Sequence, residues 1–168
     1  KLLAGHKVEA VETTATGVKV TVSAAGETKV LEAEQALVAI GFRPNSKGLG
    51  LEEVGIKLSE RGFVEIDEKM QTNVPGIYAI GDVTGKLMLA HVGSAQGVVA
   101  AENIAGHETV VLDYEMMPRA TYCQPQVASF GMNEKQAKER GYKVKVGRFP
   151  FTANGKALGL AEPAGWVK

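Results

Sequence analysis

The chain has 168 residues, 45% of them apolar and 23% charged, and its 19 basic side chains balance 19 acidic ones. A net charge of zero argues against a nucleic-acid partner and against an anionic membrane surface, because both require a basic excess. No apolar run approaches the roughly 20 residues that cross a bilayer, and no signal peptide is recognisable. We therefore expect a protein of one ordinary domain's length, in the cytoplasm, with no membrane partner.

Both ends of the chain resemble cut points. The sequence opens on Lys1 without a methionine, and it ends on Trp166–Lys168, where an apolar alternation has barely begun. We expect an internal segment of a longer protein. The 20 glycines suggest many tight turns and close backbone approaches, as around a large cofactor.

The first forty residues predict a small antiparallel meander. Apolar and polar residues alternate over 8–11, 18–22 and 28–31, and a glycine separates each run from the next. Such alternation favours a sheet with one covered face. Residues 36–40 are apolar throughout and are followed by Gly41, which is typical of a strand buried on both faces.

A second block, 47–112, predicts two further strands and a helix. Residues 63–67 alternate like a half-buried strand, 73–76 form a turn, and 77–80 are fully apolar, as in a second buried strand. From about His91 to Ala105 the sequence has helical periodicity and many small residues, which would let another backbone or a ligand approach closely.

A third block begins near Pro118. Asn133 is a good helix N-cap, and Gln136 three residues later completes a capping box. This helix should end at Gly141, and residues 143–149 return to strand alternation.

Several motifs are excluded. The glycines around Gly48–Gly50 do not have dinucleotide-fingerprint spacing and predict a surface loop before a short helix, and no P-loop or G-x-S-x-G elbow is present. The three histidines are isolated, so no metal site is expected. Cys123 is the only cysteine, and it is expected to be buried or half-buried rather than a nucleophile.

One constellation points to a ligand. The apolar residues 77–80 run directly into Gly81-Asp82, and a helix follows near His91. A carboxylate after such a strand can accept hydrogen bonds from sugar or ribitol hydroxyls, and the positive end of the helix would face the same cleft. An aspartate turn that only stops a strand explains the spacing equally well.

The run Thr72–Asp82 (TNVPGIYAIGD) resembles the second flavin motif of the flavoprotein disulfide reductases. Met88-Leu89-Ala90-His91 is similar to the dihydrolipoamide dehydrogenases in particular. Three further runs match the same family in order and spacing, namely 39–45, 125–131 and 147–154.

The resemblance implies an α/β fold made of partial, Rossmann-like FAD- and NAD(P)-binding domains with a β-meander, followed by the start of an α+β dimerisation domain. Residues 1–41 would end the NAD-binding domain, 42–115 would form the second part of the FAD-binding domain, and 116–168 would begin the interface domain.

The resemblance also implies the cofactors FAD and NAD and a set of residues that contact them. Asp82, after Gly81, would hold a ribitol hydroxyl of FAD. Backbone groups of Met88–His91 and the helix N-terminus would face the pyrimidine side of the flavin, where reduction places negative charge. Val8 and Gly41 match positions that line the NAD cleft. The implied contacts comprise Val8, Gly41, Gly81, Asp82, Met88, Leu89, Ala90 and His91.

No catalytic residue of that family lies in the chain. The redox pair C-x-x-x-x-C, both glycine fingerprints and the His-Pro…Glu base are missing. The intact protein would oxidise protein-bound dihydrolipoamide with NAD⁺, as a homodimer that serves the lipoyl-bearing E2 component of a 2-oxoacid dehydrogenase complex, whereas the segment alone should be inactive. Two alternatives stay open: a mercuric or glutathione reductase type, and a catalytically inert packing module.

Overall fold

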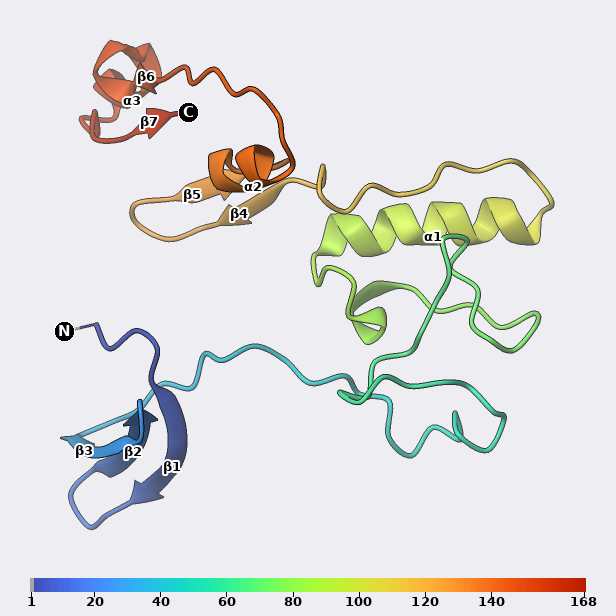
Figure 1. Ribbon diagram of the computed structural model, residues 1–168, viewed down its shortest axis with the longest axis horizontal. Helices are drawn as coiled ribbons and strands as arrows, with labels where there is room; N and C mark the ends of the chain where they lie inside the picture. Colours follow the sequence, from blue (N-terminus) through green and yellow to red (C-terminus); the bar gives the residue numbers. More distant parts are fainter. Residues whose placement is uncertain (1) are drawn as a thin grey trace. The chain divides into compact units, whose positions relative to one another are not determined.

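The computed structural model describes residues 2–168, and the chain forms two compact units, Lys1–Arg43 and Pro44–Lys168 (Figure 1). The elements in chain order are β1 (Lys7–Thr13), β2 (Val18–Ala24), β3 (Glu27–Ala33), the 3₁₀ helix η1 (Gly81–Thr84), α1 (Ala90–Ile104), β4 (Arg119–Thr121), β5 (Val127–Ser129), α2 (Glu134–Glu139), β6 (Phe149–Pro150), the 3₁₀ helix η2 (Phe151–Ala153), α3 (Gly155–Gly159) and β7 (Trp166–Val167).

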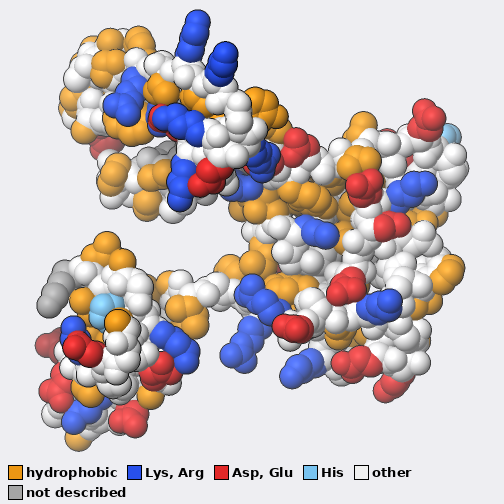
Figure 2. All heavy atoms as spheres, in the orientation of Figure 1, with side chains coloured by type: hydrophobic (Ala, Val, Ile, Leu, Met, Phe, Trp, Pro, Cys, Tyr) orange, Lys and Arg blue, Asp and Glu red, His pale blue; other side chains and the backbone are white. Residues whose placement is uncertain are grey.

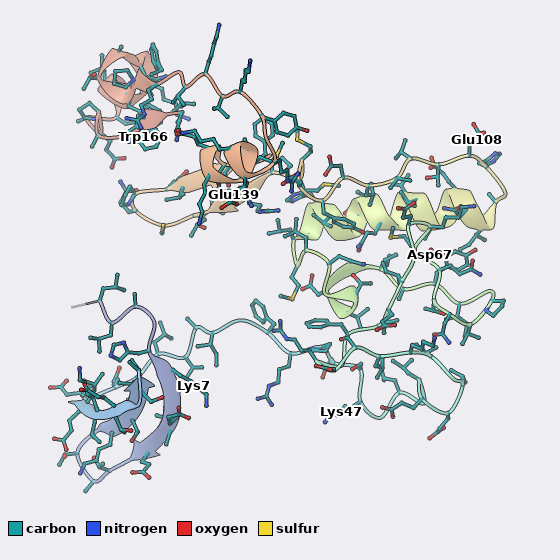
Figure 3. The ribbon with its side chains drawn as sticks, in the orientation of Figure 1. Lys7, Lys47, Asp67, Glu108, Glu139 and Trp166 are labelled. Atoms are coloured by element: carbon teal, nitrogen blue, oxygen red, sulfur yellow. The ribbon has the colours of Figure 1, made fainter. Side chains whose placement is uncertain are left out.

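The N-terminal unit is the predicted meander. Its three strands pair antiparallel in the order β1-β2-β3, with Val20 of β2 opposite Val11 on one side and Leu31 on the other. The expectation of one covered face is wrong for the described residues, because β1 and β3 are exposed along their whole length and only Val22 of β2 is buried. Long charged side chains such as Lys7 project from the sheet into solvent (Figure 3).

Four predicted strands are absent. Residues 36–40 are irregular and exposed, with Leu37 at 92% exposure, and 143–148 are irregular as well. Residues 63–67 and 77–80 each make only one isolated bridge, Leu58 with Val64 and Gln71 with Tyr78. An apolar run becomes a strand only where a neighbouring backbone completes its hydrogen bonds, and no such ladder exists beside these four segments in the described residues.

The 15-residue helix α1 confirms the predicted helix (Figure 1). It ends as the sequence indicates, with Gly106 donating to the carbonyl of Asn103 and His107 donating to that of Glu102, which together form a Schellman motif. Its inner face packs on a small core that contains Met70, Val99 and Ala100.

A tight turn before η1 completes this core. Asp67 (Figure 3) accepts hydrogen bonds from the N–H groups of Lys69 and Gln71 at 2.8 and 2.9 Å. This turn holds Met70 in a left-handed conformation, φ 64°, with its side chain 1% exposed. The glycines at 48–50 lie in a loop, as expected, but the short helix predicted after them is absent, since residues 51–55 form turns.

The C-terminal part of the second unit consists of short, exposed elements. Strand β4 pairs with β5, and β6 pairs with β7. The predicted capping box is confirmed at α2, since Asn133 and Gln136 each accept a backbone N–H from the other at 2.9 Å. Gly141 follows the helix, as expected, and its N–H donates to Lys138.

The surface mixes apolar and charged side chains in both units (Figure 2). Cys123 is exposed, so the expectation of a buried or half-buried thiol is wrong. It lies in the irregular segment between β4 and β5, where no packed element covers it. Among the described residues, no helix has the length and apolar character that a membrane crossing requires.

Candidate cofactor site

The turn that carries Asp82 packs directly on the first half of α1. Glycine at position 93 makes this possible, since a Cβ there would lie 3.3 Å from the Cα of Gly81. Gly81 itself has a φ of 75°, a left-handed conformation that glycine adopts without strain. The small residues that the sequence places in this helix therefore allow the close backbone approach that was predicted.

A second set of contacts holds the opposite side of the turn. The N–H of Val64 donates to the carbonyl of Val83 at 2.9 Å. Gly85 closes the turn against the ring of Phe63, where an added Cβ would lie 2.6 Å from the ring. The backbone on both sides of Asp82 is thus fixed by residues far away in the sequence.

Asp82 is exposed, and its carboxylate has no hydrogen bond or ion pair among residues 2–168. In a turn that only ended a strand, this carboxylate would typically accept backbone N–H groups, as Asp67 does in its own turn. The Asp82 carboxylate is instead available as a hydrogen-bond acceptor for another molecule.

The N-terminus of α1 is also unsatisfied. Leu89 is the N-cap residue and is extended, and no side chain caps the helix. Its carbonyl accepts the N–H groups of Val92 and Gly93, whereas those of Ala90 and His91 have no acceptor in the described chain. Free N–H groups and the helix dipole make this end favourable for negative charge.

The side chain of His91 does not face a ligand. Its Nε2 lies 3.0 Å from the carbonyl oxygen of Pro118, an interaction that requires the proton on Nε2. His91 thereby joins the start of α1 to the segment that leads into β4, and only its backbone N–H remains for a cofactor. Met88 and Leu89 are half-buried in the loop before the helix.

The eight predicted contacts fall into two groups. Six of them, from Gly81 to His91, lie in η1, in the loop that follows it and at the start of α1. The other two are in the N-terminal unit, Val8 in the exposed strand β1 and Gly41 in the irregular segment that follows β3. Their role at the NAD cleft stays a prediction.

Sequence analysis did not identify Gln96 as a residue of this site. Its side chain is buried beneath η1, and its Oε1 accepts the N–H of Gly81 at 2.6 Å. The available signal was its place on the apolar face of α1, four residues after Val92 and three before Val99. A polar residue at such a position has to find buried partners.

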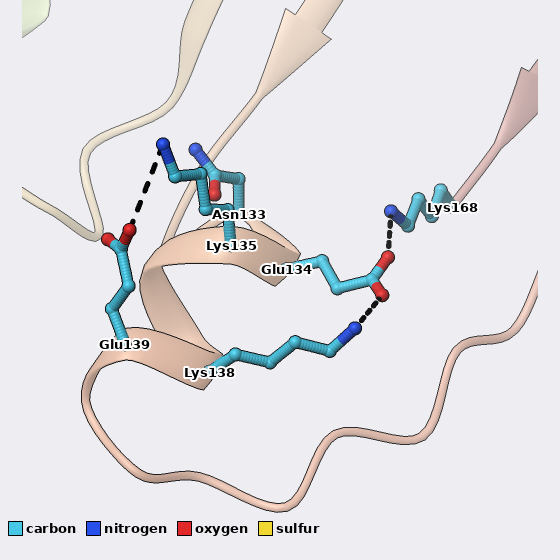
Figure 4. A pocket seen from close by; sticks show the side chains of 6 residues that line it. All are labelled: Asn133, Glu134, Lys135, Lys138, Glu139 and Lys168. Carbon is cyan, nitrogen blue, oxygen red and sulfur yellow. Dashed lines mark hydrogen bonds and ion pairs between the residues drawn. The ribbon is translucent and has the colours of Figure 1, made fainter.

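A separate open hollow lies on α2 (Figure 4). Its charged side chains neutralise one another, because Glu134 accepts from Lys138 and from Lys168 at 2.6 Å each. These two ammonium groups lower the pKa of Glu134 from 4.5 to about 2. The hollow is lined by Asn133, Glu134, Lys135, Lys138, Glu139 and Lys168. It contains none of the predicted cofactor contacts.

No group of three His, Cys, Asp or Glu side chains in residues 2–168 is arranged to hold a metal ion. The geometry at η1 and α1 does suit one part of a flavin. A free carboxylate fits a polyol chain with hydroxyl donors, and an uncapped helix N-terminus fits a ring that becomes anionic on reduction.

Similar proteins support this interpretation. A dihydrolipoyl dehydrogenase of Mycobacterium leprae is 59% identical over 169 residues, which cover all of this chain and 36% of that protein. A dihydrolipoyl dehydrogenase of Corynebacterium glutamicum is 57% identical over 173 residues, covering 100% of the chain and 37% of the relative. The chain therefore spans little more than a third of the curated relatives that it matches.

Solved structures show the same similarity. LpdA from Mycobacterium tuberculosis matches with a TM-score of 0.83 at 30% identity, over 96% of this chain and 34% of that one. The HOCl-induced flavoprotein disulfide reductase RclA from Escherichia coli matches with a TM-score of 0.79 at 26% identity, over 95% and 36% of the two chains. The predicted α/β class and the resemblance to flavoprotein disulfide reductases are both confirmed.

The family models agree with these neighbours. Residues 117–168 match the dimerisation domain of the pyridine nucleotide-disulphide oxidoreductases. Residues 1–97, more than half of the chain, match the main model of the same family. Members of this family use FAD and NAD, the two cofactors expected from the sequence. The chain belongs to the pyridine nucleotide-disulphide oxidoreductase family.

Proposed function

We propose that this chain forms part of a dihydrolipoamide dehydrogenase. The complete enzyme would oxidise a protein-bound dihydrolipoyl group to its disulfide, and NAD⁺ would accept a hydride with release of a proton. FAD supplies the electron-carrying chemistry between the two substrates. The observation that carries the proposal is the free Asp82 carboxylate beside the uncapped N-terminus of α1, in a chain 59% identical to a protein named dihydrolipoyl dehydrogenase.

Each group has a distinct task in this proposal. Asp82 accepts a hydrogen bond from a ribityl hydroxyl and so orients the cofactor. The N–H groups of Ala90 and His91 stabilise the negative charge that reduction produces on the ring. Gly81 adopts the left-handed conformation that the turn requires, and Met88 and Leu89 line the ring's edge. Val8 and Gly41 contribute to the NAD cleft.

The thiol chemistry has to come from outside these residues. The sequence contains one cysteine, so the redox-active disulfide and the His–Glu base need further segments of the complete protein. In the proposed arrangement residues 1–41 belong to the NAD-binding domain, 42–115 to the FAD-binding domain and 116–168 to the interface domain. Catalytic activity is not expected of the 168 residues alone.

The proposal also includes two protein partners and a location in the cell. The match of 117–168 to a dimerisation domain supports a homodimer. A lipoyl-bearing E2 component is the electron donor that this reaction requires. A cytoplasmic location is part of the same proposal.

A second candidate is another disulfide reductase of the family, such as a mercuric or glutathione reductase. The similarity to RclA supports this second candidate, because RclA is named a flavoprotein disulfide reductase and matches 95% of the chain. The inert packing module has no such support, since the similar proteins described above include dihydrolipoyl dehydrogenases and a flavoprotein disulfide reductase.

The test is substrate turnover by the purified protein that carries this sequence. NADH formation from dihydrolipoamide and NAD⁺ should exceed activity with oxidised glutathione or mercuric ion by orders of magnitude. Negligible dihydrolipoamide activity in a flavin-loaded, folded preparation contradicts the proposal.

A second measurement concerns the 168 residues alone. FAD titrated into this chain should bind weakly or not at all, because half of the flavin contacts are missing. Tight stoichiometric quenching of flavin fluorescence would show that the turn and α1 suffice.

A further inference from the structure

The side chain of Gln96 is 1% exposed, which makes it the most buried polar side chain among residues 2–168. It projects from the second turn of α1 toward η1. Both ends of its amide are satisfied, since Oε1 accepts from Gly81 at 2.6 Å and Nε2 donates to the hydroxyl of Tyr114 at 2.9 Å.

The same amide contacts both ends of the turn that carries Asp82. In addition to its bond with Gly81, Nε2 lies 3.5 Å from Oγ1 of Thr84, the last residue of η1. The Thr84 hydroxyl donates back to the carbonyl of Gly81 at 2.8 Å. Asp82 thus lies between two residues that one buried side chain holds.

Tyr114 ties this arrangement to the core. Its hydroxyl, besides accepting from Gln96, donates to the sulfur of Met70 at 3.9 Å, a weak hydrogen bond. Gln96 is therefore fixed from the side opposite the turn. A side chain fixed in this way transmits its position to the groups that it binds.

An apolar side chain could fill this volume but could not provide these bonds. Without Gln96, the N–H of Gly81 would face the helix with no acceptor, a situation that native proteins avoid. The turn would then be free to rotate so that water satisfies this group. Such a rotation would displace Asp82 relative to the N-terminus of α1, although neither group contacts Gln96.

We infer that Gln96 is a positioning residue that locks the Asp82 turn onto α1, so that the carboxylate and the free N–H groups face one flavin together. The inference rests on the proposed flavin-binding function of this turn. It assigns to Gln96 an effect on cofactor geometry in addition to its contribution to stability.

The experiment compares three variants of the purified protein that carries this sequence. Gln96→Leu removes both hydrogen bonds and keeps most of the volume. Gln96→Glu has the same shape, and burial favours its neutral form, in which one oxygen accepts from Gly81 and the protonated oxygen donates to Tyr114. Val99→Ala is the matched control, because it weakens the same helix through its apolar core and contacts no part of the turn.

Two quantities are measured for each variant: the dissociation constant of FAD from titration of the flavin-free protein, and the visible circular dichroism of the bound flavin. Gln96→Leu should weaken FAD binding by about tenfold and alter the flavin spectrum, because the N–H of Gly81 loses its buried acceptor. Gln96→Glu should restore most of the affinity and the spectrum, and Val99→Ala should keep both despite a lower melting temperature.

If Gln96→Leu does not fold, Tyr114→Phe provides the second test. It removes the anchor of Gln96 without touching the turn and should weaken FAD binding by about threefold. An unchanged FAD affinity and spectrum in a folded Gln96→Leu or Tyr114→Phe protein overturns the inference. Equal losses in Val99→Ala and Gln96→Leu overturn it too. A wild-type protein that binds no FAD overturns the proposed function itself, and the inference with it.

Discussion

The β-meander of the N-terminal unit and residues 44–116 of the second unit are built in opposite ways. The meander has three seven-residue strands, with an unbroken register between β2 and β3 and one register shift between Val8 and Ala10 of β1, yet Val22 is its only buried apolar residue. Residues 44–116 contain no named strand, yet they include seven of the eight buried apolar residues of the described chain.

The difference shows that regular hydrogen bonding and a packed core are separate properties. The meander is formed by local backbone pairs, which a short chain can make alone. The Asp82 turn is held by long-range contacts from Phe63, Val64, Gly93 and Gln96. A cofactor contact needs a fixed position, and the packed region supplies that position.

The largest expected effect comes from removing a core side chain. In the 168-residue chain, Met70→Ala should lower the free energy of unfolding by about 3 kcal/mol, because the cavity cannot refill. Val30→Ala in β3, where the side chain is 58% exposed, should cost less than about 1 kcal/mol. Urea unfolding followed by far-UV circular dichroism measures both. Equal losses would mean that the exposed face of the meander is in fact covered, for example by self-association.

The second-largest expected effect is a loss of FAD affinity without a loss of protein stability, at Asp82. In the complete protein that carries this sequence, Asp82→Asn should weaken FAD binding by roughly tenfold or more, since a charged acceptor is replaced by a neutral one. The melting temperature of the flavin-free protein should not change, because the Asp82 carboxylate has no partner within the described residues.

Asp67→Asn is the matched control for this measurement. Asp67 is also exposed and in a turn, but its carboxylate already accepts two backbone N–H groups. Its replacement should lower the melting temperature and leave FAD affinity unchanged. The interpretation of Asp82 fails if its variant loses stability and retains affinity.

Local patterns in the sequence predicted local structure well. Helix α1 and the capping box of α2 depend on residues within a few positions of one another, and the meander depends on strands that follow one another directly in the sequence. The four missing strands depended on neighbours instead. Residues 36–40 and 77–80 have the composition of buried strands, but composition cannot supply the adjacent backbone that a parallel sheet requires.

The candidate site was predictable only where it depends on residues that are close together in the sequence. Asp82 and the start of α1 follow from a contiguous motif. Gln96 acts through Gly81, 15 residues away, and Phe63 packs on Gly85, 22 residues away. Such pairs are specified by tertiary packing: the position of Gln96 on the apolar face of α1 indicates that it is buried, but not which group it binds.

Residues 117–168 resemble the meander, because their short elements are also exposed and depend on local contacts. Asn133→Ala should reduce the stability of α2 by about 1 kcal/mol, since it removes the side-chain acceptor of the Gln136 N–H. Asn154→Ala removes the corresponding acceptor of the Ala157 N–H at α3 and should reduce the stability of that helix by a similar amount. Amide hydrogen exchange at Gln136 and Ala157 measures these local changes. A loss spread over α1 as well would contradict the local character of this region.

The smallest expected effect is a pH dependence at α2. Lys138 and Lys168 lower the pKa of Glu134 from 4.5 to about 2. A carboxyl group with a lowered folded-state pKa stabilises the fold fully above its ordinary pKa, and this contribution is lost as the pH falls toward the lowered value. The contact between α2 and Lys168 should therefore weaken only below about pH 4.5, progressively down to about pH 2.

An NMR titration of the Glu134 side-chain carboxyl measures this directly. Lys168→Ala removes one of the two ammonium groups and should raise the Glu134 pKa toward its ordinary value, while Lys135→Ala, whose side chain pairs with Glu139 at 3.8 Å, should leave it unchanged. Added salt should reduce the difference between wild type and Lys168→Ala, because the side chains are partly exposed. An ordinary pKa for Glu134 in the wild-type protein would mean that Lys168 does not stay on α2, and that the C-terminal strand is held by its pairing with β6 alone.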